Sequence, residues 1–398
     1  MSERTLGDWV DGFLEVTENT EPPRLYRLWC GISSVAAALQ RKCYLRWGHY
    51  TFYPNMFVVL VGPSGARKGT AMAPAYRLLS DIGINMSAQK TTLEQLIRRL
   101  SEATHAKPDP STGRMQMHSC ITIFSDELVV FLGYQQYDMM AALCDWFDCK
   151  ERWSYETKNK GKDEVLGLWV NLIGATTPAL IQSNLPLESI GGGLTSRIIF
   201  VYGEGKEKSV PYPFLSQDEQ DLFDDLRNDL ERIHLMAGPY TVTEGFMELW
   251  HDWYTTQDDK PPLQLHSDRF GGYLQRRPLH TLKLSMIVSA SESSDMLITD
   301  EHLSRAIRIL EATEQPMPNV FRGMGRSPLS DIMARVMGFL GSTRLTTYGA
   351  LLERFHNDAD VQTMDKIVLA LERMGYLRRE HKAGGVVVLQ YVGKKDAS

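Results

Sequence analysis

The feature that most constrains the fold is an apolar run that ends abruptly in a glycine-rich turn. Residues 56–61 (MFVVLV) are apolar and partly β-branched, and residues 62–70 (GPSGARKGT) follow without a break. A run of this kind that stops at glycine is typical of a central strand in a parallel sheet. Parallel strands need crossover connections, which are usually helices. The sequence therefore predicts an α/β fold with helices on the faces of a parallel sheet.

Further apolar segments complete the predicted sheet, and helical patterns lie on either side of it. The other strands are expected at residues 120–124 (CITIF), 168–173 (LWVNLI) and 197–202 (RIIFVY). The first fifty residues and most of the stretch from Gln217 to Pro318 have apolar residues at helix-like intervals. We therefore expect a helical N-terminal segment (1–50), a sheet core (51–206) and a helical lid (207–322).

The last part of the chain, residues 323–398, has a different pattern. Helices are expected at 329–340, 347–355 and 361–374, and two strands at 376–379 and 386–391 enclose a glycine-containing turn. Three helices followed by a β-hairpin predict a winged-helix domain. Its basic residues Arg378, Arg379 and Lys382 are candidates for contact with DNA, although such a domain can also bind protein.

Composition narrows the class of protein without naming a partner. The chain has 398 residues, 43% of them hydrophobic and 23% charged, as in soluble globular proteins. No apolar stretch is long enough to cross a bilayer and no secretory signal is evident, so we expect a cytoplasmic protein without membrane contact. Five cysteines without a CxxC pair argue against disulfides or structural zinc. The net charge of −6 leaves room for a local basic channel.

The glycine-rich turn matches the GxxxxGK pattern of loops that hold nucleotide phosphates, known as P-loops. Such a loop needs inward backbone N–H groups, a helix N-terminus and a cation, and Lys68 is placed to reach the β- and γ-phosphates. Arg67 replaces the usual glycine and Gly69 the usual Ser/Thr, so Thr70 is the candidate Mg²⁺ hydroxyl. The expected nucleotide contacts are Gly62, Ser64, Gly65, Lys68, Gly69 and Thr70. The alternative is a glycine-rich turn that binds no nucleotide.

Two acidic residues follow the predicted strand at 120–124. Strands of a parallel sheet end at the same edge, so Asp126 and Glu127 are expected beside the phosphate loop. Asp126 is then the candidate Mg²⁺ ligand, and Glu127 the base that orients and deprotonates the attacking water. A pair of solvated acids at a strand end is the alternative.

Three groups of basic residues are candidates for other contacts. Lys158, Lys160 and Lys162 surround the tip of a predicted hairpin that could grip a nucleic acid strand, or else form a solvated loop. Arg197 follows a flexible glycine-rich loop and could stabilise charge on the γ-phosphate of a neighbouring subunit, or form an ordinary ion pair. Arg276 and Arg277 begin an apolar helix and are candidates for phosphate contact or for a solvated helix end.

Taken in order, these motifs resemble AAA+ P-loop ATPases of the helicase branch, particularly superfamily 3 and minichromosome maintenance helicases. More closely, they look like the helicase-like ATPases that phages and prophages encode beside primase functions. The resemblance rests on GPSGARKGT, IFSDE, the hairpin before LWVNLIGATTP, GGGLTSRIIFVY, LQRRPLHTLKLSMI and the terminal winged helix.

The resemblance implies a role for each matching residue. Lys68 would be the Walker A lysine, and Asp126 and Glu127 would form Walker B. Thr177 stands where this group usually has its sensor-1 asparagine. The remaining matches are Arg197 with the arginine finger and Arg276 or Arg277 with the sensor-2 helix. Residues before Tyr50 have no counterpart and are expected to form a collar or a docking segment for a partner.

The function expected from these features is an ATP- and Mg²⁺-dependent DNA helicase or translocase. It would act as a ring, expected to be a hexamer, with single-stranded DNA in its channel and with a primase or another replication protein as partner. One alternative is an AAA+ initiator or loader that uses ATP to assemble on DNA. Another is a DNA-binding assembly module whose irregular P-loop no longer hydrolyses ATP, which the departures at Arg67 and Gly69 favour.

Overall fold

The computed structural model describes residues 4–133, 137–157, 161–184, 192–259, 262–265, 267–321, 328–382 and 385–393. The chain divides into two compact units, residues 1–322 and 323–398. The first unit contains the N-terminal segment, the sheet and the helices that follow it. These three stretches, expected from the sequence as separate parts, therefore pack into a single body.

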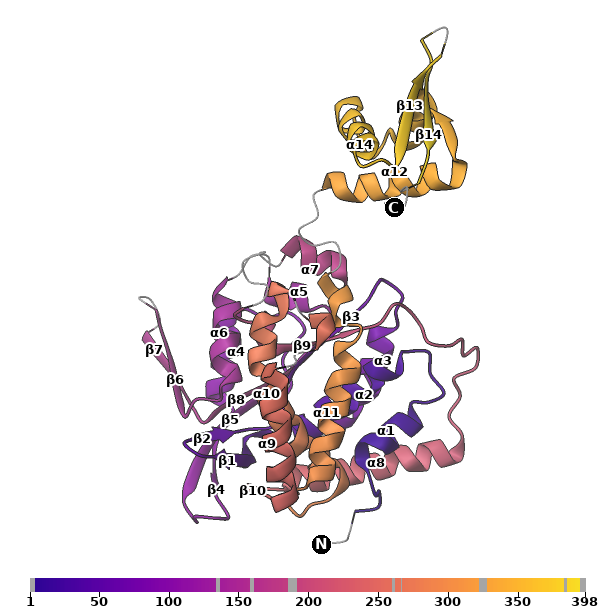
Figure 1. Ribbon diagram of the computed structural model, residues 1–398. Helices are drawn as coiled ribbons and strands as arrows, with labels where there is room; N and C mark the ends of the chain where they lie inside the picture. The colour runs from indigo at the N-terminus through magenta and orange to yellow at the C-terminus, as the bar shows by residue number, and fades with distance from the viewer. Residues whose placement is uncertain are drawn as a thin grey trace. The chain divides into compact units, whose positions relative to one another are not determined.

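A five-stranded sheet with the order β4-β5-β8-β3-β9 forms the centre of the first unit (Figure 1). Its strands are β3 (Phe57–Val61), β4 (Thr104–Pro108), β5 (Met115–Ser125), β8 (Leu168–Thr176) and β9 (Ile198–Tyr202). The last four in the order are parallel to one another, while β4 pairs antiparallel at the edge. The expected α/β class is thus confirmed, with a mixed rather than wholly parallel sheet.

Burial explains why these strands read as continuous apolar runs. Every residue of β3 and β8 is buried, as expected when helices cover both faces of a sheet. The helices of the first half are α1 (Trp9–Val16), α2 (Arg24–Leu39), α3 (Lys68–Asp81), α4 (Leu93–Glu102), α5 (Leu128–Leu132), α6 (Tyr137–Phe147) and α7 (Pro178–Asn184). They are followed by α8 (Gln217–Leu235), α9 (Glu244–Asp259), α10 (Gly271–Glu292) and α11 (Asp300–Glu314). None of the described helices is both long and apolar enough to cross a membrane.

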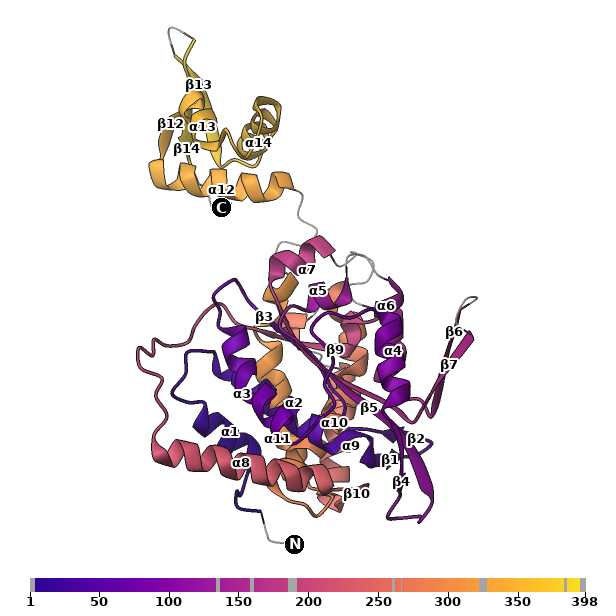
Figure 2. The ribbon, with the colours of Figure 1, turned by 180° about the vertical axis from the view of Figure 1, so that it is seen from behind.

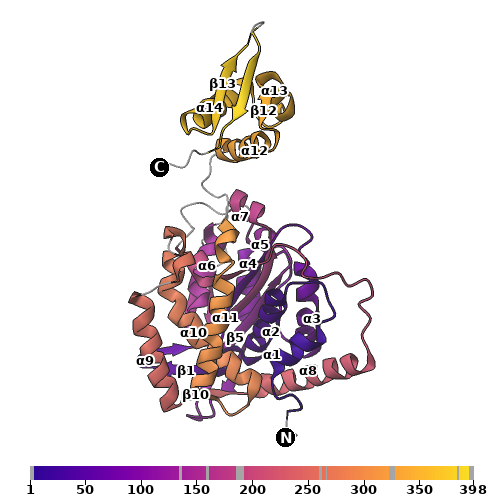
Figure 3. The ribbon, with the colours of Figure 1, turned by 45° about the vertical axis from the view of Figure 1, so that its right-hand side comes forward.

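The N-terminal helices are part of the core and not a peripheral collar. Helix α2 is buried along almost its whole length and contacts β3, β8 and β9. In Figure 3, α1, α2, α3 and α8 lie side by side, and each neighbouring pair is in contact. The helical segment before Tyr50 therefore packs within the first unit, where α2 covers the sheet; its expected role in docking a partner stays a prediction.

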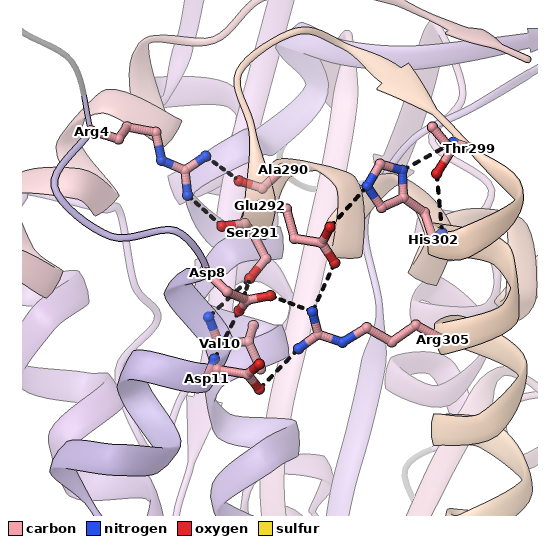
Figure 4. Close-up of polar contacts among 10 residues, drawn as sticks. All are labelled: Arg4, Asp8, Val10, Asp11, Ala290, Ser291, Glu292, Thr299, His302 and Arg305. Atoms are coloured by element: carbon pink, nitrogen blue, oxygen red, sulfur yellow. Dashed lines mark hydrogen bonds and ion pairs between the residues drawn. The ribbon is translucent and has the colours of Figure 1, made fainter.

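A polar network ties the first residues of the chain to α10 and α11 (Figure 4). Arg305 of α11 is paired with Asp8, Asp11 and Glu292. Glu292 also contacts the His302 imidazole, with 3.2 Å between Nε2 and Oε2. Burial of these charges is costly unless they are paired, so the network favours one fixed position of α1 against α10 and α11.

A second sheet, with the order β11-β10-β1-β2, was not predicted. Its strands are β1 (Cys43–Trp47), β2 (Tyr50–Phe52), β10 (Gly238–Val242) and β11 (Leu297–Ile298). Strand β1 pairs in parallel with β10, almost two hundred residues further along the chain. Strands this short have too few residues for a period-two pattern, and their partners are distant in sequence.

The predicted lysine-containing hairpin is present as β6 (Arg152–Thr157) and β7 (Gly161–Leu166). It projects away from the helices in Figures 1 and 2. At its base, β7 contacts α4 and β5.

The second unit contains three helices and a small antiparallel sheet. Its elements are α12 (Pro328–Thr343), β12 (Leu345–Thr347), α13 (Tyr348–Phe355), α14 (Val361–Arg373), β13 (Leu377–His381) and β14 (Val387–Tyr391). Strand β14 lies between β12 and β13. The helices and hairpin lie where the sequence predicts them, and β12 is an addition. Buried Leu340, Leu351 and Ile367 belong to a core of the unit's own.

The buried histidines predict a loss of stability in mild acid. Burial lowers the pKa of His118 to about 4 and that of His280 to about 3, and neighbouring cations act in the same direction. Both values lie below the pKa of about 6.5 in an unfolded chain, so protons bind the unfolded state first as the pH falls. The stabilisation is complete above pH 6.5 and is lost towards pH 4, on the order of 2 kcal/mol per histidine.

Urea unfolding at pH 7.5, 6 and 5 would measure this slope. His118→Gln should flatten it, whereas His356→Gln, at an exposed position of the second unit, should leave it unchanged. Equal slopes in the wild type and in His118→Gln would contradict the assignment.

Candidate nucleotide-binding site

Three loops meet at one edge of the five-stranded sheet. Strands β3, β5 and β8 are parallel, so the residues that follow Val61, Ser125 and Thr176 lie at their common carboxyl edge. The register places Val61 of β3 beside Thr176 of β8. Ligands of open α/β sheets bind in the crevice at this edge. The glycine-rich loop and the pair Asp126–Glu127 are therefore brought together as the sequence predicts.

The glycine-rich loop is fixed by a close approach at its first residue. A Cβ atom on Gly62 would lie 2.4 Å from both the Gly203 carbonyl oxygen and the Tyr26 hydroxyl, so only glycine fits here without displacing backbone. Gly65 has a φ of +84°, in the left-handed region that glycine favours. Ser64 is exposed in the turn, and helix α3 begins at Lys68.

Arg67 keeps the backbone shape that the usual glycine would have. Its φ of +60° is left-handed, which costs a non-glycine residue on the order of 1 kcal/mol. Its Nε lies 2.6 Å from Glu21 Oε2 in a half-exposed ion pair. The departure at Arg67 therefore changes the side chain without preventing the loop conformation.

The Lys68 side chain folds back over the loop. Its Nζ donates to the carbonyl oxygens of Gly62, at 2.8 Å, and of Pro63, at 2.9 Å. Burial lowers the pKa of Lys68, and the nearby Glu127 carboxylate opposes that shift. Among the described residues, the hydrogen-bond partners of this cation are neutral carbonyls, and a cation placed so beside a helix N-terminus is suited to hold a phosphate.

Glu127 is held by a threonine that the sequence prediction missed. The Thr176 hydroxyl, at the end of β8, donates to Glu127 Oε1 at 2.7 Å. The neighbouring Thr177, predicted to have the sensor role, instead caps α7 by accepting from the Leu180 N–H at 3.3 Å. Asp126 is exposed and accepts from Gln89 Nε2 at 3.0 Å. The alternation of side chains along β8 was the only signal that could have selected Thr176.

The start of α3 contains Thr70, the predicted hydroxyl contact for a metal ion. Thr70 is exposed on the first turn of the helix, and a Cβ on Gly69 would meet nothing within 4 Å. Successive helix residues are about 100° apart, so Thr70 does not replace a hydroxyl at position 69 without a shift of the turn. Within the described ranges, no group of three or more His, Cys, Asp or Glu side chains is placed to hold a metal ion.

Arg197 and Arg276 lie together, at the opposite edge of the sheet. Arg197 immediately precedes β9, so it is at the amino end of the strand whose carboxyl end lies beside Gly62. It pairs with Asp148, with 3.4 Å between Nη2 and Oδ2, and Arg276 donates to the Ser196 hydroxyl at 3.2 Å. Burial and then the charge of Arg197 lower the pKa of Arg276. Neither residue is at the phosphate loop of its own chain.

Arg277 has a structural partner. Its guanidinium makes a two-pronged pair with Glu314, at 2.7 and 3.0 Å, and both side chains are buried. Removing Arg277 would leave the buried Glu314 carboxylate without an ion pair among the described residues. The expected nucleotide contact of Arg277 is therefore replaced by a link between α10 and α11.

The predicted DNA-binding lysines are only partly within the described chain. Lys158 and Lys160 lie outside the described residues, as does the side chain of Lys162, whose backbone belongs to β7. In the second unit Arg378 and Lys382 are exposed, and Arg379 lies 3.6 Å from Glu372.

Comparison with known proteins finds no family model that matches this chain and no curated protein that matches its sequence. The function of this chain is therefore inferred from the geometry of its own residues.

The close approach at Gly62 predicts that even a methyl group there is disruptive. Gly62→Ala should destabilise the protein by about 1–3 kcal/mol, since the added carbon meets backbone oxygen. It should also abolish binding of a fluorescent ATP analogue. Gly69→Ala is the matched control, because the space there is open and alanine favours the helix. Thermal unfolding and fluorescence titration would measure both effects; wild-type behaviour of Gly62→Ala would contradict the loop geometry.

Proposed function

We propose that this chain is an AAA+-like P-loop ATPase that moves along DNA as a ring oligomer. The observation that supports it most is the meeting of Lys68 with Glu127 at the carboxyl edge of the sheet. In this proposal the five-stranded sheet is the P-loop core, α8 to α11 belong to the lid, and the second unit is a winged helix. The cofactors are ATP and Mg²⁺.

Each residue at the sheet edge has a chemical task in this proposal. The Lys68 ammonium exchanges its two loop carbonyls for oxygens of the β- and γ-phosphates. Glu127 accepts a proton from the attacking water, and the Thr176 hydroxyl fixes the direction of that carboxylate. Mg²⁺, held by Asp126 and by Thr70 after a shift of the turn, would neutralise charge that develops on the phosphates.

The position of Arg197 is the argument for a ring. It is at the opposite edge of the sheet from Lys68, so it can serve a phosphate only in a neighbouring subunit. Arg276 is beside it, and the charge of Asp148 acts on both arginines. A phosphate group would give this pair of guanidinium groups a better counter-ion. A hexamer is the ring size proposed.

DNA is the proposed track, and the β6–β7 hairpin and the second unit are its proposed contacts. The hairpin projects from the body, as a channel loop would. Arg378 and Lys382 are exposed in the second unit and are its proposed DNA contacts. A primase or another replication protein is the partner proposed for the assembly.

A second candidate function is a DNA-binding assembly module without turnover. It is favoured by Gly69, which leaves the first helical turn without the usual hydroxyl, and by the side chain that Arg67 adds where P-loops usually have glycine. An initiator or loader that assembles on DNA with ATP would share every contact named above, apart from dependence on the hairpin.

ATP turnover distinguishes these functions. We expect hydrolysis that single-stranded DNA stimulates, and a fall of at least about 100-fold in Glu127→Gln, because a general base contributes 10²–10⁴-fold. Lys68→Ala should lose both binding and turnover. Glu102→Gln, a surface carboxylate paired with Arg98, is the matched control and should be unaffected. Nucleotide binding by the wild type without turnover, with DNA present, would select the assembly module.

The role of Arg197 in a neighbouring subunit is tested by mixing two inactive variants. Arg197→Ala keeps its own phosphate loop and Lys68→Ala keeps its arginine, so a mixed ring forms some complete sites. Random mixing in equal amounts should restore activity at about a quarter of the interfaces. Arg197→Ala alone should fall by about 10³-fold. Size-exclusion chromatography would verify assembly, and a mixture as inactive as its components would contradict the proposal.

A further inference from the structure

A cavity of about 280 Å³ lies apart from the nucleotide site. Residues 50–53 and Asn55 form one wall, residues 147–149 form another, and Leu279 and Lys283 of α10 complete it. None of the residues assigned to phosphate binding contributes to it. Most of its lining surface is apolar, with a few polar groups, which is the usual composition of a ligand pocket.

The cavity has a buried cation without a counter-ion. The Lys283 side chain is within a residue that is 3% exposed, and its Nζ donates to Asn55 Oδ1 at 2.7 Å and to the Phe147 carbonyl oxygen at 3.5 Å. Within the described chain no carboxylate forms an ion pair with it. Its ammonium group also lies 3.9 Å from the centre of the Phe147 ring. A lysine has three N–H donors, so one is left for a ligand.

The charge on Lys283 persists at neutral pH. Burial lowers its pKa to about 8, and the charge of Asp148 opposes that shift. An oxygen acceptor in the cavity would therefore meet a protonated amine.

The outer wall is an aromatic platform. Tyr50 and Phe52 alternate along β2 and so share one face of the strand. Their rings are stacked, with 6.1 Å between centroids and 7° between planes, and Tyr50 is 68% exposed. Exposed aromatic faces of this kind are the surfaces on which bases of single-stranded nucleic acids stack.

We propose that this cavity receives one unstacked base of a single DNA strand, with a preference for thymine or guanine. The base stacks on Tyr50 and Phe52, and Lys283 donates to its carbonyl oxygen. Thymine and guanine present a carbonyl acceptor, O4 or O6, where adenine presents an amino donor, and a lysine N–H cannot pair with an amino donor. This inference rests on the proposed function, because it assumes that the protein binds and moves along single-stranded DNA.

The location of the cavity suggests how an occupied site would reach the ATPase centre of a neighbour. Residues 147–149 are a wall of the cavity, and within them Asp148 is the partner of Arg197. Cys149 has a left-handed φ of +51°, and Arg41 donates to its carbonyl oxygen at 2.7 Å. A base in the cavity would therefore touch the segment that positions the Asp148 carboxylate, the ion-pair partner of Arg197.

Direct binding tests the site without ATP. Fluorescence anisotropy with labelled oligo-dT and oligo-dA should show tighter binding of oligo-dT by the wild type. Tyr50→Ala should weaken oligo-dT binding by roughly five- to 100-fold, from the loss of one stacked base. Tyr212→Ala is the matched control, because Tyr212 is 73% exposed and stacks on Phe214 in a distant loop.

Lys283→Met tests the carbonyl contact separately from stacking. It should remove the preference for oligo-dT over oligo-dA while oligo-dA binding stays unchanged. Since Lys283 is buried, the thermal unfolding of the Lys283→Met variant must be measured together with its DNA binding. Photocrosslinking of the wild type with an oligonucleotide that contains 5-iododeoxyuridine should label Tyr50 or Phe52, which needs no variant.

The outcomes separate this site from the proposed function. Unchanged oligo-dT binding in Tyr50→Ala, or crosslinks that map elsewhere, would overturn the cavity while DNA-stimulated turnover could still stand. Stabilisation by inorganic phosphate that needs Lys283 but not Tyr50 would identify an anion site instead and would also overturn it. A wild-type protein that binds no single-stranded DNA would overturn both.

Discussion

The contact between one tyrosine hydroxyl and the ends of two strands determines where the glycine-rich loop can begin. Tyr26 of α2 donates to the carbonyl oxygen of Val61 at 2.7 Å, and its oxygen lies 3.2 Å from that of Gly203. Val61 is the last residue of β3, and Gly203 directly follows the last residue of β9. One buried hydroxyl therefore joins helix α2 to the ends of both strands. Because the space beside Gly62 is filled, the chain can only turn outwards there. The loop and the start of α3 follow from that turn.

The sequence predicted the central sheet well because parallel strands are buried on both faces. Strands β3, β5, β8 and β9 each overlap the predicted apolar runs, and those runs need no knowledge of a partner. The second sheet has no such local signal. Strand β1 is paired with β10 and β2, and its Trp47 packs edge-on against Phe246 and Trp250 of α9. Its identity as a strand depends on residues that are distant in the chain.

Site residues could be predicted where a motif specifies both the residue type and the strand end that positions it. They could not be predicted where two adjacent residues of the same type face different sides of an element. Lys68 and Glu127 are both determined by the strands that precede them. The choice between Thr176 and Thr177 depends on which side of β8 each faces, and only Thr176 reaches Glu127. Arg276 and Arg277 are likewise adjacent, but the helix face places Arg277 against Glu314 and Arg276 against Ser196. Such alternatives are decided by tertiary packing.

The distance between the two edges of the sheet explains why, in the proposed function, a single subunit does not contain a complete ATPase site. Strand β9 has five residues, which at about 3.3 Å each separate its ends by roughly 15 Å. Arg197 lies at one end and the phosphate loop at the other, and a rigid buried sheet cannot bend to bring them together. In an isolated chain, therefore, Asp148 remains the partner of Arg197. In the proposed ring, assembly would exchange that surface carboxylate for a phosphate and would join hydrolysis in one subunit to the packing of residues 147–149 in the next.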